Sequence, residues 1–319
     1  MFVGCNLNRC LACLSVGWNT SAAENLFAPC TLSAIIEAMP ASKPNSATTR
    51  YALVTGAGSG LGRAFCLRLA REGWHVGVTD IDLAAARQTL AAIVTDRGSG
   101  QVERLDVADA MAWHRLLEKI RSEWPRLDLL INNAGVCAAG EIGAAPLDDF
   151  QQVLQVNFHG VLNGCQTIVP WLKETAPGGH IVNVASIFGL VAPPTMGAYN
   201  ASKAAVVALS ETLYGELLPL RVGVTVVAPG FFVSQLLDHG QFSTDRQRQI
   251  ADEYMQNAQI TAEEVVGQTL AAIRRRQLYV VLGRRARWIW RLKRWLPARF
   301  AQLIAWRYRR KLQKSPNDD

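Results

Sequence analysis

The chain has 319 residues, a length that suits one large domain or two small ones. Half of the residues are hydrophobic and 18% are charged, the balance of a globular α/β protein. The longest apolar run, 222–237, contains Pro229 and Gly230 and falls short of the roughly 18–20 residues that a membrane-spanning helix needs. The sequence therefore excludes a spanning helix.

Charge is distributed unevenly along the chain, although the net value is only +7. Residues 265–317 contain 15 Lys and Arg and no Asp or Glu, so the rest of the chain has 18 basic and 26 acidic residues and a net charge of −8. An acidic body thus carries a basic C-terminal end, where we expect any anionic partner to bind.

The first 49 residues are interpreted as a leader, disordered or beginning upstream of the natural start. They lack the basic start and clean apolar segment of a secretory signal, and Met39 is a plausible natural first residue. We expect residues 1–38 to carry no function.

Cys10 and Cys13 have the spacing of half a zinc site, but no second pair or histidine follows nearby, so no metal site is predicted.

Cysteines in the body are isolated, as in a reduced, cytoplasmic protein.

From residue 51 onward, short β-rich runs alternate with longer helical patterns. This alternation predicts a Rossmann-type, doubly wound, parallel sheet within one domain over 50–283. The seven predicted strands lie at 51–56, 75–80, 102–107, 127–135, 180–186, 222–230 and 277–283. Thr261-x-x-Glu264 is a capping box that opens the last predicted helix of the domain.

A glycine-rich loop, TGAGSGLG at 55–62, joins the first strand to the first helix. A helix N-terminus offers unpaired amides to a pyrophosphate, and glycine permits close backbone approach. A glycine-rich turn without a nucleotide remains the alternative. Asp80 ends the second strand 18 residues after Gly62, where a carboxylate can hold a ribose 2′-hydroxyl and repel a 2′-phosphate. This favours NAD over NADP. Arg63 is the one nearby positive charge that could instead accommodate the 2′-phosphate of NADP.

Tyr199 and Lys203 lie at i and i+4 of a predicted helix and share one face. A nearby ammonium favours the phenolate, so we expect a lowered pKa at Tyr199 and a role as general acid and base. Ser186 ends a strand 13 residues earlier, where its hydroxyl could hold a substrate oxygen. Asn157 is a polar residue within a helical stretch without an obvious packing purpose. An ordinary exposed helix turn is the alternative for Tyr199 and Lys203.

Taken together, these motifs resemble those of the classical short-chain dehydrogenase/reductase family over roughly residues 50–283. The family's glycine pattern T-G-x-x-x-G-x-G falls on 55–62, where Gly58 looks incidental, and its N-N-A-G falls on 132–135. The resemblance implies a catalytic tetrad of Asn157, Ser186, Tyr199 and Lys203. It implies that a nicotinamide cofactor is held by Gly56, Ser59, Gly60, Leu61, Gly62, Asp80, Asp106, Val107, Asn133, Ala134, Gly135, Tyr199, Lys203, Pro229 and Gly230.

The resemblance also implies roles for the tetrad in an oxidoreductase that interconverts an alcohol and a ketone or aldehyde. Tyr199 would take the alcohol proton, Ser186 would polarise the substrate oxygen, and Lys203 would bind the nicotinamide ribose. Asn157 would hold a water that links Lys203 to solvent. The family implies a homodimer or homotetramer. The alternatives are a non-catalytic NAD-binding sensor or scaffold and an extended-type epimerase or dehydratase, whose different glycine loop is absent here.

Three segments expected near the substrate, 136–140, 187–198 and 231–237, are mostly apolar and contain no Arg or Lys. They indicate a hydrophobic, lipid-like alcohol or ketone, unless they are apolar because they pack on the body.

The basic tail at 284–319 carries an apolar stripe. Trp288, Leu292, Trp295 and Leu296 are spaced as one helix face, and Pro297 then breaks the helix or starts another, in which Phe300, Leu303 and Ile304 align. Both segments are basic on the other face, a pattern that predicts a basic amphipathic helical extension lying through 284–314 on an anionic membrane surface, at the inner face. Docking on the body, on a sister subunit or on nucleic acid are the alternatives, but no nucleic-acid fold accompanies the tail, so no such partner is expected.

Overall fold

The computed structural model describes residues 49–175, 177–230, 240–256, 258 and 260–313. Residues 1–48 of the predicted leader, the Cys10–Cys13 pair and the apolar segment 231–237 lie outside the described residues.

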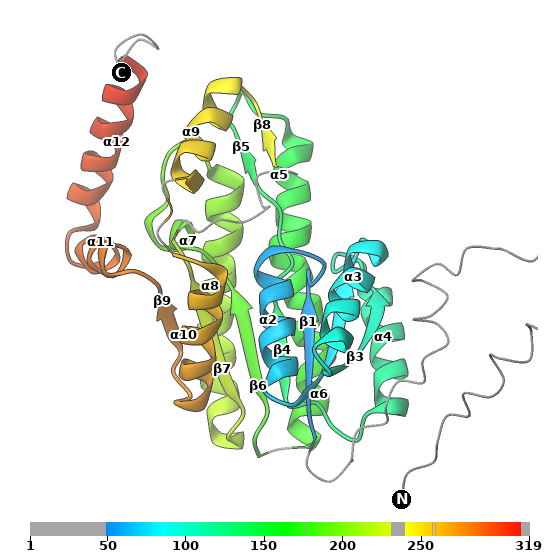
Figure 1. The fold of residues 1–319 in the computed structure, drawn as a ribbon. Helices are drawn as coiled ribbons and strands as arrows, with labels where there is room; N and C mark the ends of the chain where they lie inside the picture. The colour runs from blue at the N-terminus through cyan, green and yellow to red at the C-terminus, as the bar shows by residue number, and fades with distance from the viewer. Residues whose placement is uncertain (1–48, 176, 231–239, 257, 259, 314–319) are drawn as a thin grey trace, which may run out of the picture. The chain divides into compact units, whose positions relative to one another are not determined.

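A seven-stranded parallel sheet forms the centre of the protein (Figure 1), as the alternating pattern predicted. Its order is β3-β2-β1-β4-β6-β7-β9. The strands are β1 (Arg50–Thr55), β2 (Trp74–Asp80), β3 (Ser99–Arg104), β4 (Leu129–Asn132), β6 (His180–Val184), β7 (Gly223–Ala228) and β9 (Tyr279–Val281). Two short strands, β5 (Ala138–Ala139) and β8 (Gln241–Phe242), pair separately. All of these pairings are parallel, so the loops that follow the large sheet's strands gather at one edge.

The third strand begins and ends earlier than predicted. β3 covers Ser99–Arg104, whereas the sequence pattern placed it at 102–107. Ladder pairing with β2 ends at Asp80 and Arg104, after which the Leu105 amide still donates to the Asp80 carbonyl. The Asp106 carboxylate then accepts a hydrogen bond from the Ala108 amide at 2.9 Å, which turns the chain away from the sheet.

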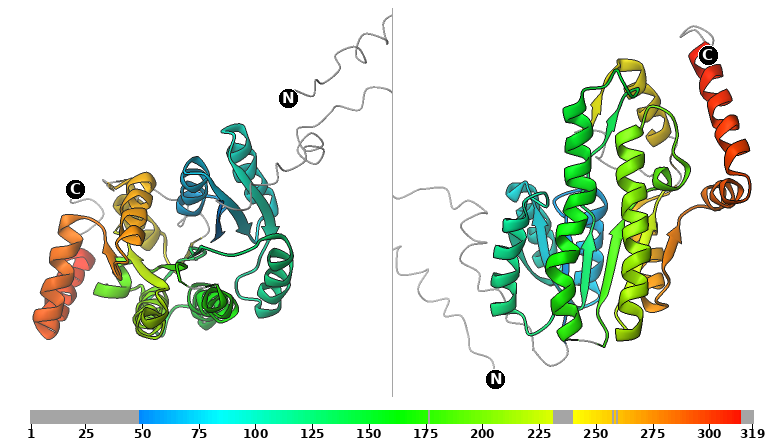
Figure 2. Two further views of the ribbon diagram at one scale, coloured as in Figure 1. Left: turned by 90° about the horizontal axis from the view of Figure 1, so that it is seen from below. Right: turned by 180° about the vertical axis from the view of Figure 1, so that it is seen from behind.

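Helices cover both faces of the sheet (Figure 2). One face is covered by α2 (Gly60–Arg71), α3 (Leu83–Thr95) and α10 (Ala262–Arg274), and the other by α4 (Ala110–Glu123), α6 (Gly160–Glu174) and α8 (Gly197–Leu217). Shorter helices are α5 (Leu147–Leu154), α7 (Ile187–Val191), the 3₁₀ helix η4 (Leu218–Leu220) and α9 (Asp245–Gln256). Two separate hydrophobic clusters, one per face, form the core, as expected when both faces of a parallel sheet are buried.

The C-terminal tail forms two helices, α11 (Arg284–Trp295) and α12 (Pro297–Gln313). Pro297 is the first residue of α12, a position where its missing amide hydrogen costs no helical hydrogen bond. None of the helices in the described part of the chain combines the length and apolarity needed to cross a bilayer.

Candidate active site

The glycine loop between β1 and α2 has a backbone that only glycine adopts easily. Gly56 and Gly60 have φ angles of +60° and +50°. A Cβ on Gly62 would overlap the Gly56 carbonyl oxygen, and one on Gly56 would lie 2.7 Å from the Ala134 Cα. Three of the predicted cofactor-binding glycines are therefore required by the local geometry.

Gly58 is not incidental, contrary to the expectation from the family pattern. Its Cβ would lie 2.7 Å from the Ala85 Cβ and 3.0 Å from the Asp80 Oδ2. Its amide donates to that same carboxylate oxygen at 2.9 Å, while the Asp82 amide donates to Oδ1 at 3.0 Å. Asp80 thus holds the glycine loop against the carboxyl end of β2. Gly58 and Asp80 are far apart in the sequence, so only the tertiary structure shows this contact.

The N-terminus of α2 fits an anionic ligand. Ser59 is the N-cap residue but makes no side-chain capping hydrogen bond, and the first turn contains no acidic residue. The first amides of the helix, including that of Leu61, are therefore not capped by Ser59, and the helix dipole favours negative charge there. Together with the close-packed glycines and Asp80, this loop fits the pyrophosphate and ribose of a dinucleotide.

Residues 132–135 fasten the end of β4 to the glycine loop. The Asn133 Nδ2 donates to the carbonyls of Thr55 and Gly56 at 2.9 and 3.0 Å. The Thr55 Oγ1 accepts from the amides of Asn133 and Ala134 at 3.0 and 3.1 Å. The predicted cofactor residue Asn133 therefore acts on the shape of the loop.

Gly135 follows this clamp and faces the predicted tetrad. A Cβ there would lie 3.1 Å from the Asn157 Oδ1 and 3.4 Å from the Lys203 Nζ. The structure therefore brings Gly135, Asn157 and Lys203 together. Because Gly135 has no Cβ, the space beside the Lys203 ammonium stays open.

Tyr199 and Lys203 project from α8 and are both buried. The Lys203 Nζ donates to the Val184 carbonyl at 2.9 Å and lies 5.8 Å from the centre of the Tyr199 ring. Ser186, also buried, is the N-cap of α7, and its Oγ accepts from the Phe188 amide at 3.2 Å. The three side chains meet near the carboxyl end of β6. They are not the exposed helix turn that the sequence left open.

Burial dominates the ionisation of this pair. It raises the pKa of Tyr199 far above its ordinary value, with a further upward effect from Cys137 and an opposing hydrogen bond with Ser186. This direction is opposite to the lowering expected from Lys203. Burial also lowers the pKa of Lys203 to about 8, because its ammonium is withdrawn from water.

Asn157 lies in a π-helical turn, Gln155–His159, between α5 and α6. Its Oδ1 accepts from the Val136 amide at 2.8 Å, and its Nδ2 donates to the Val136 carbonyl at 2.9 Å and to the Ser202 Oγ at 3.1 Å. Both donors of the side-chain amide are therefore used by protein atoms. The predicted role of the Asn157 side chain in holding a water therefore has no free amide hydrogen to draw on.

Two residues beside the tetrad were missed by the sequence analysis. Ser202 joins Asn157 to α8, since its Oγ also donates to the Tyr199 carbonyl at 2.9 Å. Cys137 is buried close enough to interact electrostatically with both Tyr199 and Lys203, and burial raises its own pKa to about 12. The position of Ser202 next to Lys203 in YNASK was a usable signal. Cys137 lies in segment 136–140, which was expected near the substrate, but no role was predicted for its thiol.

The remaining predicted cofactor residues lie at the same edge of the sheet. Asp106 and Val107 follow β3 beside Asp80, and the Val107 carbonyl accepts from the Trp113 Nε1 at 3.1 Å. The Pro229 carbonyl accepts from the Ile187 amide at 2.9 Å, which ties the end of β7 to α7, and Gly230 is the next residue.

The apolar segments around the site divide between core and surface. Ile187 and Leu190 are buried in the core cluster on the α8 face, so part of segment 187–198 is apolar because it packs on the body. Phe188 and Val191 are only half-buried, and the Phe188 ring lies edge-on to Tyr199 with centroids 6.2 Å apart. Phe188 is thus an apolar neighbour of the predicted general acid and base.

Comparison with known proteins identifies the family. A family model described as short chain dehydrogenase matches residues 50–241, which is more than half of the chain. The protein therefore belongs to the short-chain dehydrogenase family, whose members are oxidoreductases, as its motifs indicated. A solved short chain dehydrogenase/reductase from Burkholderia phymatum, in complex with NAD, has 30% sequence identity and a TM-score of 0.71. That comparison covers 85% of this chain and 97% of the other.

Among curated proteins, the Mycobacterium tuberculosis protein named "Probable oxidoreductase EphD" is 41% identical over 177 residues, which are 56% of this chain and 30% of that protein. The chain thus spans less than a third of the length of this relative. The cyclopentanol dehydrogenase of Comamonas testosteroni is 33% identical over 196 residues, which are 60% of this chain and 78% of that protein.

Proposed function

We propose that the protein is an NAD-dependent oxidoreductase that interconverts a hydrophobic secondary alcohol and its ketone, or an alcohol and its aldehyde. The observation that carries this proposal is the meeting of Tyr199, Lys203 and Ser186 at the carboxyl edge of the sheet that also holds the glycine loop. An acid–base group, a cation and a hydroxyl are there placed beside a loop shaped for a dinucleotide.

Tyr199 is the proposed general acid and base. During oxidation it takes the proton of the substrate hydroxyl, and during reduction it returns that proton to the carbonyl oxygen. The Ser186 hydroxyl orients the same substrate oxygen. A bound nicotinamide cofactor would supply the hydride chemistry, as the acceptor in its oxidised form and as the donor in its reduced form.

Lys203 opposes the effect of burial on Tyr199. The buried phenol favours its neutral form, and a positive charge nearby favours the phenolate. Because burial lowers the pKa of Lys203 to about 8, the ammonium is present at neutral pH and disappears in alkaline solution. Its hydrogen bond to Val184 holds it in position, and its remaining donors can bind a ribose hydroxyl.

The cofactor preference rests on Asp80. Its carboxylate is held by Gly58 and Asp82, and the next residue, Ile81, is uncharged and 56% exposed. A 2′-phosphate placed there meets a negative charge, which supports NAD over NADP.

The three cysteines in the described residues, Cys66, Cys137 and Cys165, are free, which supports a cytoplasmic setting.

The proposed substrate class rests on the half-buried Phe188 beside Tyr199 and on the similarity to a cyclopentanol dehydrogenase. A hydrophobic alcohol suits such an apolar neighbour, because its own surface is removed from water on binding.

Tyr199→Phe tests the function. We expect kcat with a responsive hydrophobic alcohol to fall by about 100-fold or more, since the variant cannot transfer a proton. The Kd for NAD should stay within about twofold of wild type, because the glycine loop is untouched. Absorbance of reduced nicotinamide measures turnover, and titration calorimetry measures NAD binding.

Tyr214→Phe is the matched control, because Tyr214 lies on the same helix and is partly buried against the core. It should keep wild-type turnover. Undiminished activity of Tyr199→Phe contradicts the mechanism, and a wild-type protein that binds NAD but turns over none of a panel of hydrophobic alcohols and ketones contradicts the function. Running wild type with NADP as well tests the role of Asp80, since kcat/KM should be higher with NAD.

A further inference from the structure

One face of the tail is fixed to the body of the protein. Trp290 packs beside Tyr279 with ring centroids 5.2 Å apart, and Phe300 is 5% exposed. The Lys293 Nζ donates to the Leu190 carbonyl at 2.6 Å, and the Tyr308 hydroxyl bonds the Glu141 carboxylate at 2.7 Å. These contacts join α11 to α7, the helix that begins after Ser186, and join α12 to the loop after β5.

The other face leaves large apolar side chains in solvent. We call this set the tryptophan face: Trp288, Leu292, Trp295, Leu296, Leu303 and Trp306. Trp295 is 86% exposed and Trp288 67% exposed. The stripe predicted on α11 is therefore the surface that the body does not cover. Exposed tryptophans and leucines on both tail helices indicate a surface that binds something apolar.

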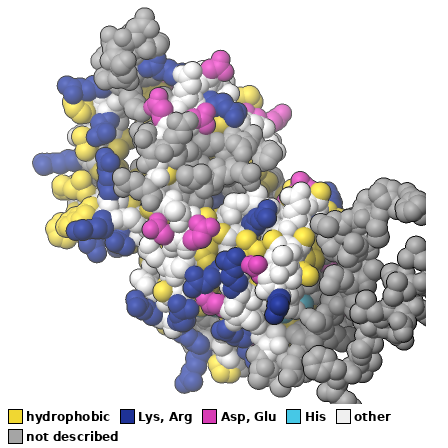
Figure 3. Space-filling view, viewed as in Figure 1, with side chains coloured by type: hydrophobic (Ala, Val, Ile, Leu, Met, Phe, Trp, Pro, Cys, Tyr) yellow, Lys and Arg dark blue, Asp and Glu magenta, His cyan; other side chains and the backbone are white. Residues whose placement is uncertain are grey.

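Basic side chains surround the tryptophan face. Residues 284–313 include 11 Lys and Arg and no Asp or Glu. The guanidiniums of Arg291 and Arg310 lie 5.8 and 4.1 Å from the ring centres of Trp288 and Trp306. None of the ion pairs recorded among the described residues involves α11 or α12. Figure 3 shows hydrophobic and basic side chains side by side along the edge formed by the tail.

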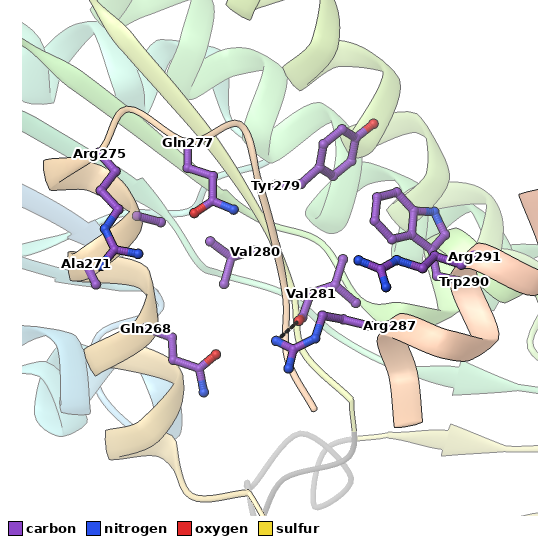
Figure 4. Close-up of a pocket in the computed structure, with 11 residues that line it drawn as sticks. Gln268, Ala271, Arg275, Gln277, Tyr279, Val280, Val281, Arg287, Trp290 and Arg291 are labelled. Carbon is purple, nitrogen blue, oxygen red and sulfur yellow. Dashed lines mark hydrogen bonds between the residues drawn. The ribbon is translucent and has the colours of Figure 1, made fainter. Parts of the chain in front are cut away.

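The positive surface continues into a pocket of about 370 Å³ between α10, β9 and α11 (Figure 4). Arg275, Arg287 and Arg291 line this pocket, and its lining includes no carboxylate. Gln268, Gln277, Tyr279 and Trp290 are its other polar and aromatic lining residues. Guanidiniums without acidic partners in the lining form a setting that suits a phosphate group.

We propose that the tryptophan face and its arginines dock on an anionic lipid bilayer, so that the protein is a peripheral membrane protein. Tryptophan and leucine side chains enter the interface between headgroups and acyl chains, and arginines bind the lipid phosphates. A second copy of the chain fits this surface poorly. Two tails meeting face to face would place like charges against each other with no acidic residue in either helix.

Docking stands independently of the oxidoreductase reaction, because its argument uses only the tail and the pocket beside it. A bilayer at this surface lies against the helices that contact α7 and the loop after β5. A substrate dissolved in the bilayer could then reach Tyr199 from the side of the tail. This second step, unlike the docking, rests on the proposed function.

Flotation of the full chain with lipid vesicles tests the docking. We expect the wild type to float with vesicles that contain phosphatidylglycerol, to stay at the bottom with phosphatidylcholine alone, and to lose binding as salt is raised. A triple variant, Trp288→Ser, Trp295→Ser and Trp306→Ser, should bind at least about tenfold more weakly. The single variants Arg291→Gln and Arg310→Gln should each weaken vesicle binding about fivefold.

Met111→Ser is the matched control, because Met111 is 61% exposed on α4 and belongs to the body. It should float as wild type does. Circular dichroism of every variant establishes that folding is retained. Quenching of tryptophan fluorescence by brominated lipids adds a direct readout, and Trp295→Phe should lose part of the quenching while still floating.

The proposal is overturned by a wild-type protein that stays at the bottom with anionic vesicles, or by a folded triple variant that floats undiminished. It is also overturned when vesicles do not bind and the triple variant converts a dimer to a monomer in light scattering, since the tail then joins two subunits. Binding to duplex DNA in place of vesicles, unchanged in the tryptophan variant, would assign the tail to nucleic acid. None of these measurements depends on turnover.

Discussion

Gly62 shows how closely the backbone of α2 approaches the glycine loop. A Cβ at this residue would overlap the Gly56 carbonyl oxygen and lie 2.6 Å from the Asn133 Nδ2, which itself holds the loop. At residue scale, the candidate cofactor site therefore depends on backbone contacts that leave no room for a methyl group. An ideal Cβ on Gly215, in α8, would have no atom within 4 Å apart from those of its chain neighbours and its own helix backbone.

Gly62→Ala and Gly215→Ala form a matched pair at this scale. Gly62→Ala should lower the free energy of unfolding by about 1–3 kcal/mol, because the loop must move away. It should also weaken NAD binding at least about tenfold. Gly215→Ala should leave NAD binding unchanged and raise stability by up to about 1 kcal/mol, because alanine favours the helix. Urea unfolding and calorimetric titration measure both; wild-type NAD affinity in Gly62→Ala contradicts this account.

α10 is the element whose start was best marked in the sequence, and it covers one face of the sheet. The Thr261 Oγ1 accepts from the Glu264 amide at 3.2 Å, and the Glu264 carboxylate accepts from the Thr261 amide at 3.1 Å. This capping box places Val265 and Leu270 of α10 in the core. The start of α11 has no side-chain cap, and its placement depends on packing against α7 and β9.

Thr261→Ala should lower the free energy of unfolding by about 1 kcal/mol, because the amides of the first turn lose their acceptor. Urea denaturation measures the change. Thr212→Ala is the control, since Thr212 is exposed within α8 and its hydroxyl bonds only the Ala208 carbonyl one turn earlier. That variant should lie within about 0.5 kcal/mol of wild type. Equal losses in the two variants would show that the cap contributes nothing.

Stability of the whole molecule should depend on pH through a histidine far from the site. His180 is 4% exposed, and a ring nitrogen lies 2.8 Å from the Thr225 Oγ1. Burial, with a smaller effect from Arg276, lowers the pKa of His180 from 6.5 to about 4. Between these values the unfolded chain binds a proton that the folded chain does not, so stability falls as the pH drops from about 6.5 to about 4.

The loss expected from His180 is on the order of 3 kcal/mol across this window. Urea unfolding at about pH 7 and about pH 4 measures the total, to which the buried His75 also contributes, and His180→Gln should remove the His180 share. His114→Gln, at an exposed position on α4, should keep it. A pH dependence that is the same in wild type and His180→Gln contradicts the assignment to His180.

Much of the fold could be predicted from local patterns. Strand and helix order, the glycine loop and the capping box at Thr261 follow from residues close in sequence, because hydrophobic period and capping chemistry act within a few residues. The same motifs placed Tyr199, Lys203, Ser186 and Asn157 in one candidate site. The predicted third strand was shifted because the Asp106 turn ends pairing with β2 earlier than the apolar pattern suggests.

What the sequence by itself determined was the family and the order of the elements. Only the tertiary structure decided that Gly58 faces Asp80 and Ala85, that burial raises the pKa of Tyr199, and which face of the tail meets the body. The physical reason is the range of the forces. Propensity and capping act between neighbours in the chain, whereas desolvation and close packing depend on atoms that folding brings together from distant positions.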